Sequence, residues 1–207
     1  MTIQVLTDTK EWEHVKSAAL LTIHKKAAKD SLTASEWKHA MLLARHSPLR
    51  EFRIRVIIED LPRWIADQLV RHTVGVNNFM ATMRPDRTKR LLRDQQSMAD
   101  LTTFQQTYNI DSFLSMCRTR LCVGAVSKET REVIQNVVQI LSHTEPEIAM
   151  YCAPPCIHQG GCKEKALCDL TNGKHCNVYQ NFAIQIENRQ VFDLKDRFTF
   201  YKNYCNS

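Results

Sequence analysis

Apolar side chains along this chain recur mainly with the period of an α-helix. One predicted helix has Pro62 in its first turn, where proline is tolerated. Its apolar face is formed by Leu61, Trp64, Ile65, Leu69 and Val70. Further helices are predicted from a turn at 7–9 to about residue 26, over 33–46 behind a capping-box pattern at 33–36, over 91–99, over 110–121 and from Ser127 onward.

Strands are predicted where apolar and polar residues alternate. Phe52, Ile54 and Val56 alternate with Arg53 and Arg55, and this pattern predicts a strand with one solvent-exposed face. Other strands are predicted over 3–6, 182–186 and 191–192, and residues 77–87 are expected to form a loop. These elements predict a mixed α/β or α+β fold.

The size and composition indicate a globular protein with one core. The chain has 207 residues, 43% of them hydrophobic and 24% charged, and no Gly/Pro/Ser-rich linker divides it. We therefore expect a single domain over 1–207. No apolar run approaches the roughly 20 residues that span a membrane, and the first residues do not resemble a secretory leader. A cytoplasmic location is expected.

The charge balance favours anionic ligands. The formal net charge is +6 and the sequence pI is near 8.9. Basic residues are spread over 45–55, 84–93 and 118–131, without a polybasic tail or a recognisable nucleic-acid motif. Small anions are therefore better candidate partners than nucleic acid.

A polar stretch at 67–84 is hard to explain by packing. Gln68, Arg71 and His72 come at the end of a predicted helix, and Arg84 closes the loop that follows. Arginine presents a rigid fork of donors that suits phosphate or a carbonyl edge, and histidine adds a donor or acceptor near neutral pH. The stretch predicts a nucleotide site. The alternative is an ordinary helix end, where basic residues interact favourably with the helix dipole.

Eight cysteines are present, and several gather between residues 152 and 176. Four of them form the most closely spaced group, and zinc or an iron–sulfur cluster is held by such ligands. We predict that any metal is bound by Cys152, Cys156, Cys162 and Cys168. The alternative is a loop of reduced cysteines without metal, since stable disulfides are disfavoured in the cytosol.

Three segments resemble the flavin-dependent thymidylate synthases. Residues 45–52, Arg-His-Ser-Pro-Leu-Arg-Glu-Phe, resemble the family's His-x-Ser-Pro segment, residues 53–62 its alternating strand, and residues 68–72 most of its Gln-Leu-Val-Arg-His-Arg. A further stretch over 113–131 is similar to the family's Arg-Leu-Cys-x-x-Ala-Gln-x-Glu-Ile-Arg block. The order and spacing agree from residue 3 to about residue 151.

The resemblance implies an α+β fold with a central mixed or antiparallel sheet, flanked by helices, in a homotetramer. It implies FAD-dependent transfer of a one-carbon unit to C5 of a pyrimidine deoxynucleotide, from dUMP to dTMP, with methylenetetrahydrofolate as carbon donor and NADPH as reductant. The residues that match the flavin-binding set are His46, Arg71, His72 and Asn78. Those that match the nucleotide-binding set are Gln68, Thr82, Arg84 and Arg120, the two arginines being the catalytic candidates.

Each of these residues also has a structural interpretation. His46 closes a helix, Gln68 is a solvated helix residue, and Arg120 pairs with Glu129. Asn78 and Arg84 are then polar loop residues. Arg71 and His72 are the strongest pair, because both match the motif and both lie at the predicted helix end.

The chain departs from the family at several positions. Thr73 replaces the third residue of Arg-His-Arg, and Phe79 replaces a glutamate. Thr82 matches the family serine only if one residue is inserted, since Ala81 takes that place otherwise, and Pro85 stands where a tyrosine is usual. Two alternatives stay open: a flavin-dependent hydroxymethylase acting on dUMP or dCMP, and a noncatalytic relative that binds nucleotide or nucleic acid.

Overall fold

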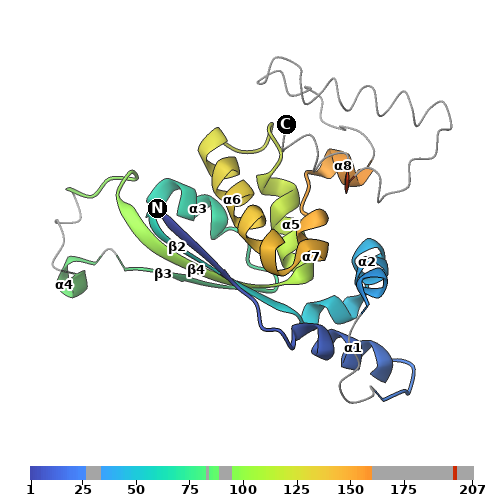
Figure 1. Cartoon of the computed structure of the whole chain (residues 1–207). Helices are drawn as coiled ribbons and strands as arrows, with labels where there is room; N and C mark the ends of the chain where they lie inside the picture. The colour runs from blue at the N-terminus through green and yellow to red at the C-terminus, as the bar shows by residue number, and fades with distance from the viewer. Residues whose placement is uncertain (27–33, 83, 89–94, 160–197, 200–207) are drawn as a thin grey trace, which may run out of the picture. The chain divides into compact units, whose positions relative to one another are not determined.

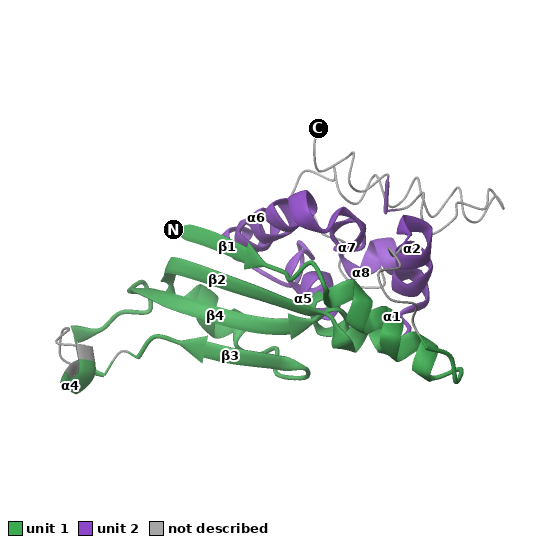
Figure 2. Cartoon of the chain, turned by 60° about the horizontal axis from the view of Figure 1, so that its bottom comes forward, with its two compact units in different colours: residues 1–33, 47–113 green, residues 34–46, 114–207 purple. Residues whose placement is uncertain are grey.

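The computed structural model describes residues 1–26, 34–82, 84–88, 95–159 and 198–199. The chain forms two compact units, each built from two segments (Figure 2). The first unit contains Met1–Thr33 and Ser47–Phe113, and the second contains Ala34–His46 and Leu114–Ser207. The strands predicted over 182–186 and 191–192 lie outside the described residues.

The described part of the first unit contains a four-stranded antiparallel sheet of order β1-β2-β4-β3 (Figures 1 and 2). The strands are β1 Thr2–Leu6, β2 Arg53–Pro62, β3 Val76–Met80 and β4 Leu101–Asn109. The predicted α+β class with an antiparallel sheet is therefore confirmed.

Strand β2 follows the predicted alternation. Ile54, Val56 and Ile58 are buried, whereas Arg53 and Arg55 are exposed on the opposite face. An irregularity interrupts the pairing with β4 between Ile58 and Leu61, where Asp60 has a φ of 56°. The buried face of this strand forms part of the core of the first unit.

Two sequence predictions for the region between β3 and β4 are wrong. Residues 77–87 were expected to be a loop, but 77–80 lie in β3, and Pro85–Thr88 form the short helix α4. A helix was expected over 91–99, and the described part of that range, 95–99, is not α-helical. The strand pattern in β4 is masked because Thr102 and Gln106 share the buried face with Phe104 and Tyr108.

The described part of the first unit contains the helices α1 Glu11–Leu21, the 3₁₀ helix η1 Ser47–Glu51, α3 Arg63–Leu69 and α4, besides the first residues of α5. Trp12 of α1 packs edge-to-face on Phe52, with ring centroids 5.1 Å apart. Helix α3 contacts β2 and β4, starts directly after Pro62 and ends at Leu69. Arg71 and His72 therefore lie just beyond the helix rather than in its last turn.

The described part of the second unit is helical. It contains α2 Ser35–Ala44, α6 Lys128–Thr144, α7 Pro146–Met150, α8 Pro155–Gln159 and the larger part of α5 Ile110–Arg120, whose first residues belong to the first unit. Helix α6 begins as predicted at Ser127, whose hydroxyl accepts a hydrogen bond from the Thr130 amide at 3.3 Å. The predicted capping box at 33–36 is wrong, because Ala34 is the N-cap residue of α2 and its methyl group cannot accept a hydrogen bond.

The core of the second unit includes the apolar face of α6 and an aromatic cluster around Tyr151. The buried apolar residues of α6 are Val133, Ile134, Val137 and Leu141. Among the described residues, no helix is long and apolar enough to cross a membrane.

Candidate functional site

The predicted site is centred on residues 70–75, which connect α3 to β3 and which we call the α3–β3 turn. The side chains of Arg71 and Thr73 are exposed, and His72 is half-buried. The His72 amide donates to the Leu69 carbonyl oxygen at 3.1 Å, which bends the chain back at the end of α3. The turn therefore presents Arg71 and Thr73 to solvent from the end of a packed helix.

Two side-chain amides hold the start of this turn. Asn78 of β3 donates through Nδ2 to the His72 carbonyl oxygen at 3.1 Å. Gln106 of β4 donates through Nε2 to the Asn78 Oδ1 at 2.6 Å and to the Leu69 carbonyl oxygen at 3.1 Å. The Tyr108 hydroxyl donates to the Gln106 Oε1. The turn is thereby tied to both β3 and β4.

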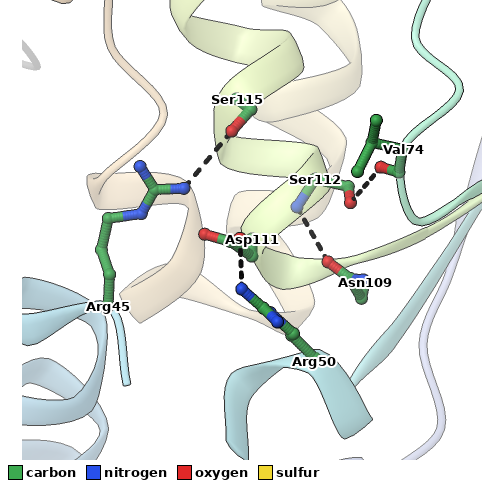
Figure 3. Close-up of polar contacts among 7 residues, drawn as sticks. All are labelled: Arg45, Arg50, Val74, Asn109, Asp111, Ser112 and Ser115. Carbon is green, nitrogen blue, oxygen red and sulfur yellow. Dashed lines mark hydrogen bonds and ion pairs between the residues drawn. The ribbon is translucent and has the colours of Figure 1, made fainter. Parts of the chain in front are cut away.

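The other end of the turn rests on the first turn of α5 (Figure 3). Ser112 donates through its hydroxyl to the Val74 carbonyl oxygen at 2.7 Å, and Asn109 accepts from the Ser112 amide at 2.8 Å. Gly75 has a φ of +68°, and a Cβ there would lie 2.4 Å from the Ser112 Oγ. Glycine is required at this position by both its backbone conformation and the close approach of Ser112.

Strand β3 separates two residues that the sequence placed in one loop. Asn78 pairs with Gln106 across the strands, and Phe79 pairs with Gln105. Because side chains alternate along a strand, Asn78 faces the core side and Phe79 faces the other side of the sheet. Phe79 is 62% exposed. The two residues therefore cannot line the same surface.

Thr82 and Arg84 come together after β3. The Thr82 hydroxyl accepts a hydrogen bond from the Arg84 amide at 3.2 Å. The Arg84 guanidinium donates to both carboxylate oxygens of Asp86, at 3.1 and 2.8 Å, and both side chains are largely exposed. The sequence analysis did not single out Asp86. A carboxylate two residues after an arginine that is a candidate for binding phosphate could have indicated this ion pair. An anionic ligand at Arg84 has to compete with this carboxylate.

The remaining predicted residues lie in different places. Gln68 is half-buried in α3 of the first unit, whereas His46 and Arg120 belong to the second unit. The His46 amide donates to the Met41 carbonyl oxygen at 3.2 Å, and Arg45 has a φ of 50°, so the backbone at 45–46 closes α2. The His46 side chain is exposed, whereas Arg120, the last residue of α5, is 8% exposed.

Arg45 and Glu129 have local roles in the second unit. The Arg45 Nη2 donates to the Ser115 hydroxyl at 3.3 Å (Figure 3). The pKa of Glu129 is lowered by hydrogen bonds from its own backbone amide and from Ser127, with smaller contributions from Lys128 and Arg131. Glu129 therefore belongs to the N-terminal cap of α6.

The cysteine set is only partly described. Cys152 is buried, and its thiol donates to the Ile148 carbonyl oxygen at 3.5 Å. Burial and the neighbouring Cys152 thiol raise the pKa of Cys117 well above its ordinary value. Cys156 is half-buried in α8, and Cys162 and Cys168 lie outside the described residues. Within the described ranges, no group of three or more potential metal ligands is present, so the four-cysteine site stays a prediction.

Comparison by sequence finds no related protein, whereas comparison by structure finds proteins of one common fold. No family model and no curated protein matches the sequence. Thymidylate Synthase X (ThyX) from Helicobacter pylori, solved with FAD and dUMP, aligns with a TM-score of 0.57 at 13% identity, over 73% of this chain and 99% of that one. The chain has the fold of the flavin-dependent thymidylate synthases.

A second solved structure has the same fold. The UMP/dUMP methylase PolB from Streptomyces cacaoi, bound with 5-Br dUMP, aligns with a TM-score of 0.55 at 12% identity, over 74% of this chain and 98% of that one. Both alignments thus confirm the fold that the sequence motifs predict. At this identity the likeness concerns the fold, and the reaction has to be argued from the residues.

Proposed function

We propose that this protein is an FAD-dependent enzyme that transfers a one-carbon unit to C5 of a pyrimidine deoxynucleotide. The observation that carries the proposal is the α3–β3 turn, which is fixed at both ends and presents Arg71 in a chain with the flavin-dependent thymidylate synthase fold. In the proposed reaction methylenetetrahydrofolate supplies the carbon and NADPH supplies the reducing equivalents. We also propose that the protein works as a homotetramer.

The residues of the turn fit an anionic, planar cofactor. Arg71 offers an exposed guanidinium on a backbone that is held by hydrogen bonds, so the backbone loses little conformational freedom when the side chain binds a phosphate. His72 adds a ring that is already half-buried. In the proposed site Arg71, His72 and His46 hold FAD, and Asn78 supports the first two by donating a hydrogen bond to the His72 carbonyl oxygen. When bound, the flavin supplies the redox chemistry.

The nucleotide is assigned to Gln68, Thr82, Arg84 and Arg120. Arginines suit its phosphate and base carbonyls, and the neutral amide of Gln68 orients the base. The task of these residues is to hold the reactants in line and to stabilise negative charge that develops on the pyrimidine ring. Arg84 is oriented by Asp86 before a ligand arrives, and the phosphate takes over its donors.

A second candidate keeps the flavin but changes the product or the base. Thr73 occupies the exposed part of the turn where the family has an arginine, so the turn carries one positive charge fewer. Hydroxymethylation, or action on dCMP instead of dUMP, is compatible with this change. Product analysis with each nucleotide distinguishes these reactions.

Flavin binding is the first test. The purified protein, incubated with FAD and freed of excess cofactor, is expected to show the flavin absorbance bands. Arg71→Ala should weaken FAD binding by about 10- to 100-fold, because a charge-assisted hydrogen bond is worth about 1.5–3 kcal/mol. Lys128→Ala removes the same charge from an exposed position on α6 and should bind FAD as the wild type does. A wild-type protein that stays colourless contradicts the proposal.

A further inference from the structure

Gln106 is a buried amide on the core side of β4. It is 2% exposed and lies between Val56 of β2 and Asn78 of β3 in the register of the sheet. A buried amide is costly unless its donors and acceptor are satisfied. We propose that Gln106 is a positioning residue of the flavin site, which acts through Leu69 and Asn78 on the backbone of Arg71 and His72. This inference rests on the proposed function.

The hydrogen bonds fix the orientation of both amides. The carbonyl oxygens of Leu69 and His72 only accept, so the Gln106 Nε2 and the Asn78 Nδ2 must face them. The second N–H of Gln106 is then directed to the Asn78 Oδ1, and its oxygen accepts from Tyr108. Both N–H groups and the oxygen of Gln106 are engaged. We call Gln106 and Asn78 the amide clamp.

The amide clamp controls both sides of residue 72. The Leu69 carbonyl oxygen that Gln106 binds also accepts the His72 amide, at 3.1 Å. The His72 carbonyl oxygen is held by Asn78. Because these contacts are made to the main chain, they set the direction in which the Arg71 and His72 side chains leave the turn.

Strand pairing alone does not account for this arrangement. β3 and β4 are joined by their own antiparallel register from Val76 to Met80, and Phe104 and Tyr108 already fill the core beside them. The amide clamp instead reaches out of the sheet, to the end of α3 and to the turn that follows. Its contacts are therefore made where the flavin-binding residues start.

Hydrogen exchange of the full-length protein tests whether the clamp exists. Gln106→Leu removes both donors at similar side-chain volume, and we expect the His72 amide to exchange at least tenfold faster. Tyr108→Phe is the matched control, because it removes one hydrogen bond to Gln106 and leaves both of its donors. Unchanged exchange at 69–75 in Gln106→Leu would overturn the inference, whether or not the protein binds flavin.

FAD titration tests what the clamp is for. Gln106→Leu should weaken FAD binding about tenfold in the native background and less than twofold in the Arg71→Ala/His72→Ala background, because the effect passes through these two side chains. An equal loss in both backgrounds indicates a purely structural role and overturns the inference. A wild-type protein that binds no FAD rejects the proposed function and the positioning role together, while hydrogen exchange still decides whether the clamp exists.

A milder variant covers the case in which Gln106→Leu does not fold. Asn78→Ala removes the donor to the His72 carbonyl oxygen and the acceptor of one Gln106 N–H, and it adds no charge beside the turn. It lies on a half-buried position of β3, where substitution is better tolerated than at Gln106. We again expect a tenfold loss of FAD affinity in the native background and none in the Arg71→Ala/His72→Ala background. An unchanged affinity in the native background contradicts the inference.

Discussion

Neighbouring residues in β3 have different chemical roles. Asn78 supports the α3–β3 turn from the core side, whereas Phe79 is exposed on the other face of the sheet. The replacement of the family's glutamate by Phe79 therefore changes the open face of the sheet, and it leaves the support of the turn intact. A change at Phe79 therefore does not disturb Asn78, because the alternation of side chains along β3 places the two on opposite faces of the sheet.

The ion pair of Arg84 and Asp86 predicts an unusual gain of affinity. Asp86→Asn removes the carboxylate that competes with a nucleotide phosphate for Arg84. Exposed ion pairs are worth about 0–1 kcal/mol, so we expect dUMP to bind up to about fivefold more tightly. Calorimetric titration at low salt measures this, with Glu132→Gln of α6 as the control for loss of an exposed charge. Weaker binding would mean that Asp86 mainly orients Arg84.

Gly75 should be intolerant of a side chain. Gly75→Ala places a Cβ 2.4 Å from the Ser112 Oγ at a φ of +68°. Strain of this kind costs about 1–3 kcal/mol, and the displaced turn should also bind FAD less well. Urea denaturation checks the stability. Ser112→Ala in the same chain should recover part of the loss, since it removes the nearest clashing atom. No recovery would place the cost in the backbone conformation and in the second close contact, with the Asn109 Nδ2 at 2.6 Å.

At the scale of elements, the sequence predicts the helices and strands whose core-facing side chains are all apolar or nearly so. β1, β2, α3, α5 and α6 were predicted near their observed positions, because their buried or, in β1, half-buried positions carry apolar side chains at the proper period. β4 was missed because Thr102 and Gln106 occupy its buried face. The residues of the site were predicted only in part for a related reason. Arg71 and His72 were found by motif, but Gln106 and Ser112 act through contacts with residues that are distant in sequence. Such contacts leave no periodic signal.

A pair of helices in the second unit should show pH-dependent stability. Lys38 of α2 lies 3.4 Å from Glu147 of α7. Burial raises the pKa of Glu147, but its backbone amide, Ser35 and Lys38 together lower it below its ordinary value of 4.5. The ionised form is favoured in the folded state, so this contribution is present above the unfolded pKa and is lost as the pH falls through the folded one.

Glu147→Gln tests that expectation. The variant should be less stable than the wild type near neutral pH by no more than about 1 kcal/mol, and the difference should disappear in acid. Denaturant unfolding at several pH values measures the difference between the two proteins. A deficit that is constant from neutral pH to below the folded pKa would show that packing, and not the charge of Glu147, accounts for the change.

At the scale of the molecule, the predicted ligand residues are divided between two compact units. Gln68, Arg71, His72, Asn78, Thr82 and Arg84 belong to the first unit, and His46 and Arg120 belong to the second. The fold could be predicted from motifs that lie in both units, but the assembly of a complete site could not. In the proposed homotetramer, sedimentation should give a mass close to four times that of the 24.0 kDa chain.

Base preference is a property of the whole site. With Thr73 in place of an arginine, we expect dUMP and dCMP to bind with more similar affinities than in an ordinary thymidylate synthase, and a purine monophosphate to bind at least tenfold more weakly. Arg84→Ala and Arg120→Ala should each weaken pyrimidine binding. Titration with the three nucleotides decides this, since equal affinity for all three would show that the site does not recognise a pyrimidine.

The amide clamp also limits how this chain can change over generations. Gln106, Asn78 and Tyr108 are linked by directional hydrogen bonds, so replacing one leaves polar atoms of the others without their partners. Replacing all three by apolar residues at once avoids that penalty but releases the His72 carbonyl oxygen. The three positions should therefore covary, and a library randomised at all three and selected for flavin binding should return matched combinations rather than independent choices.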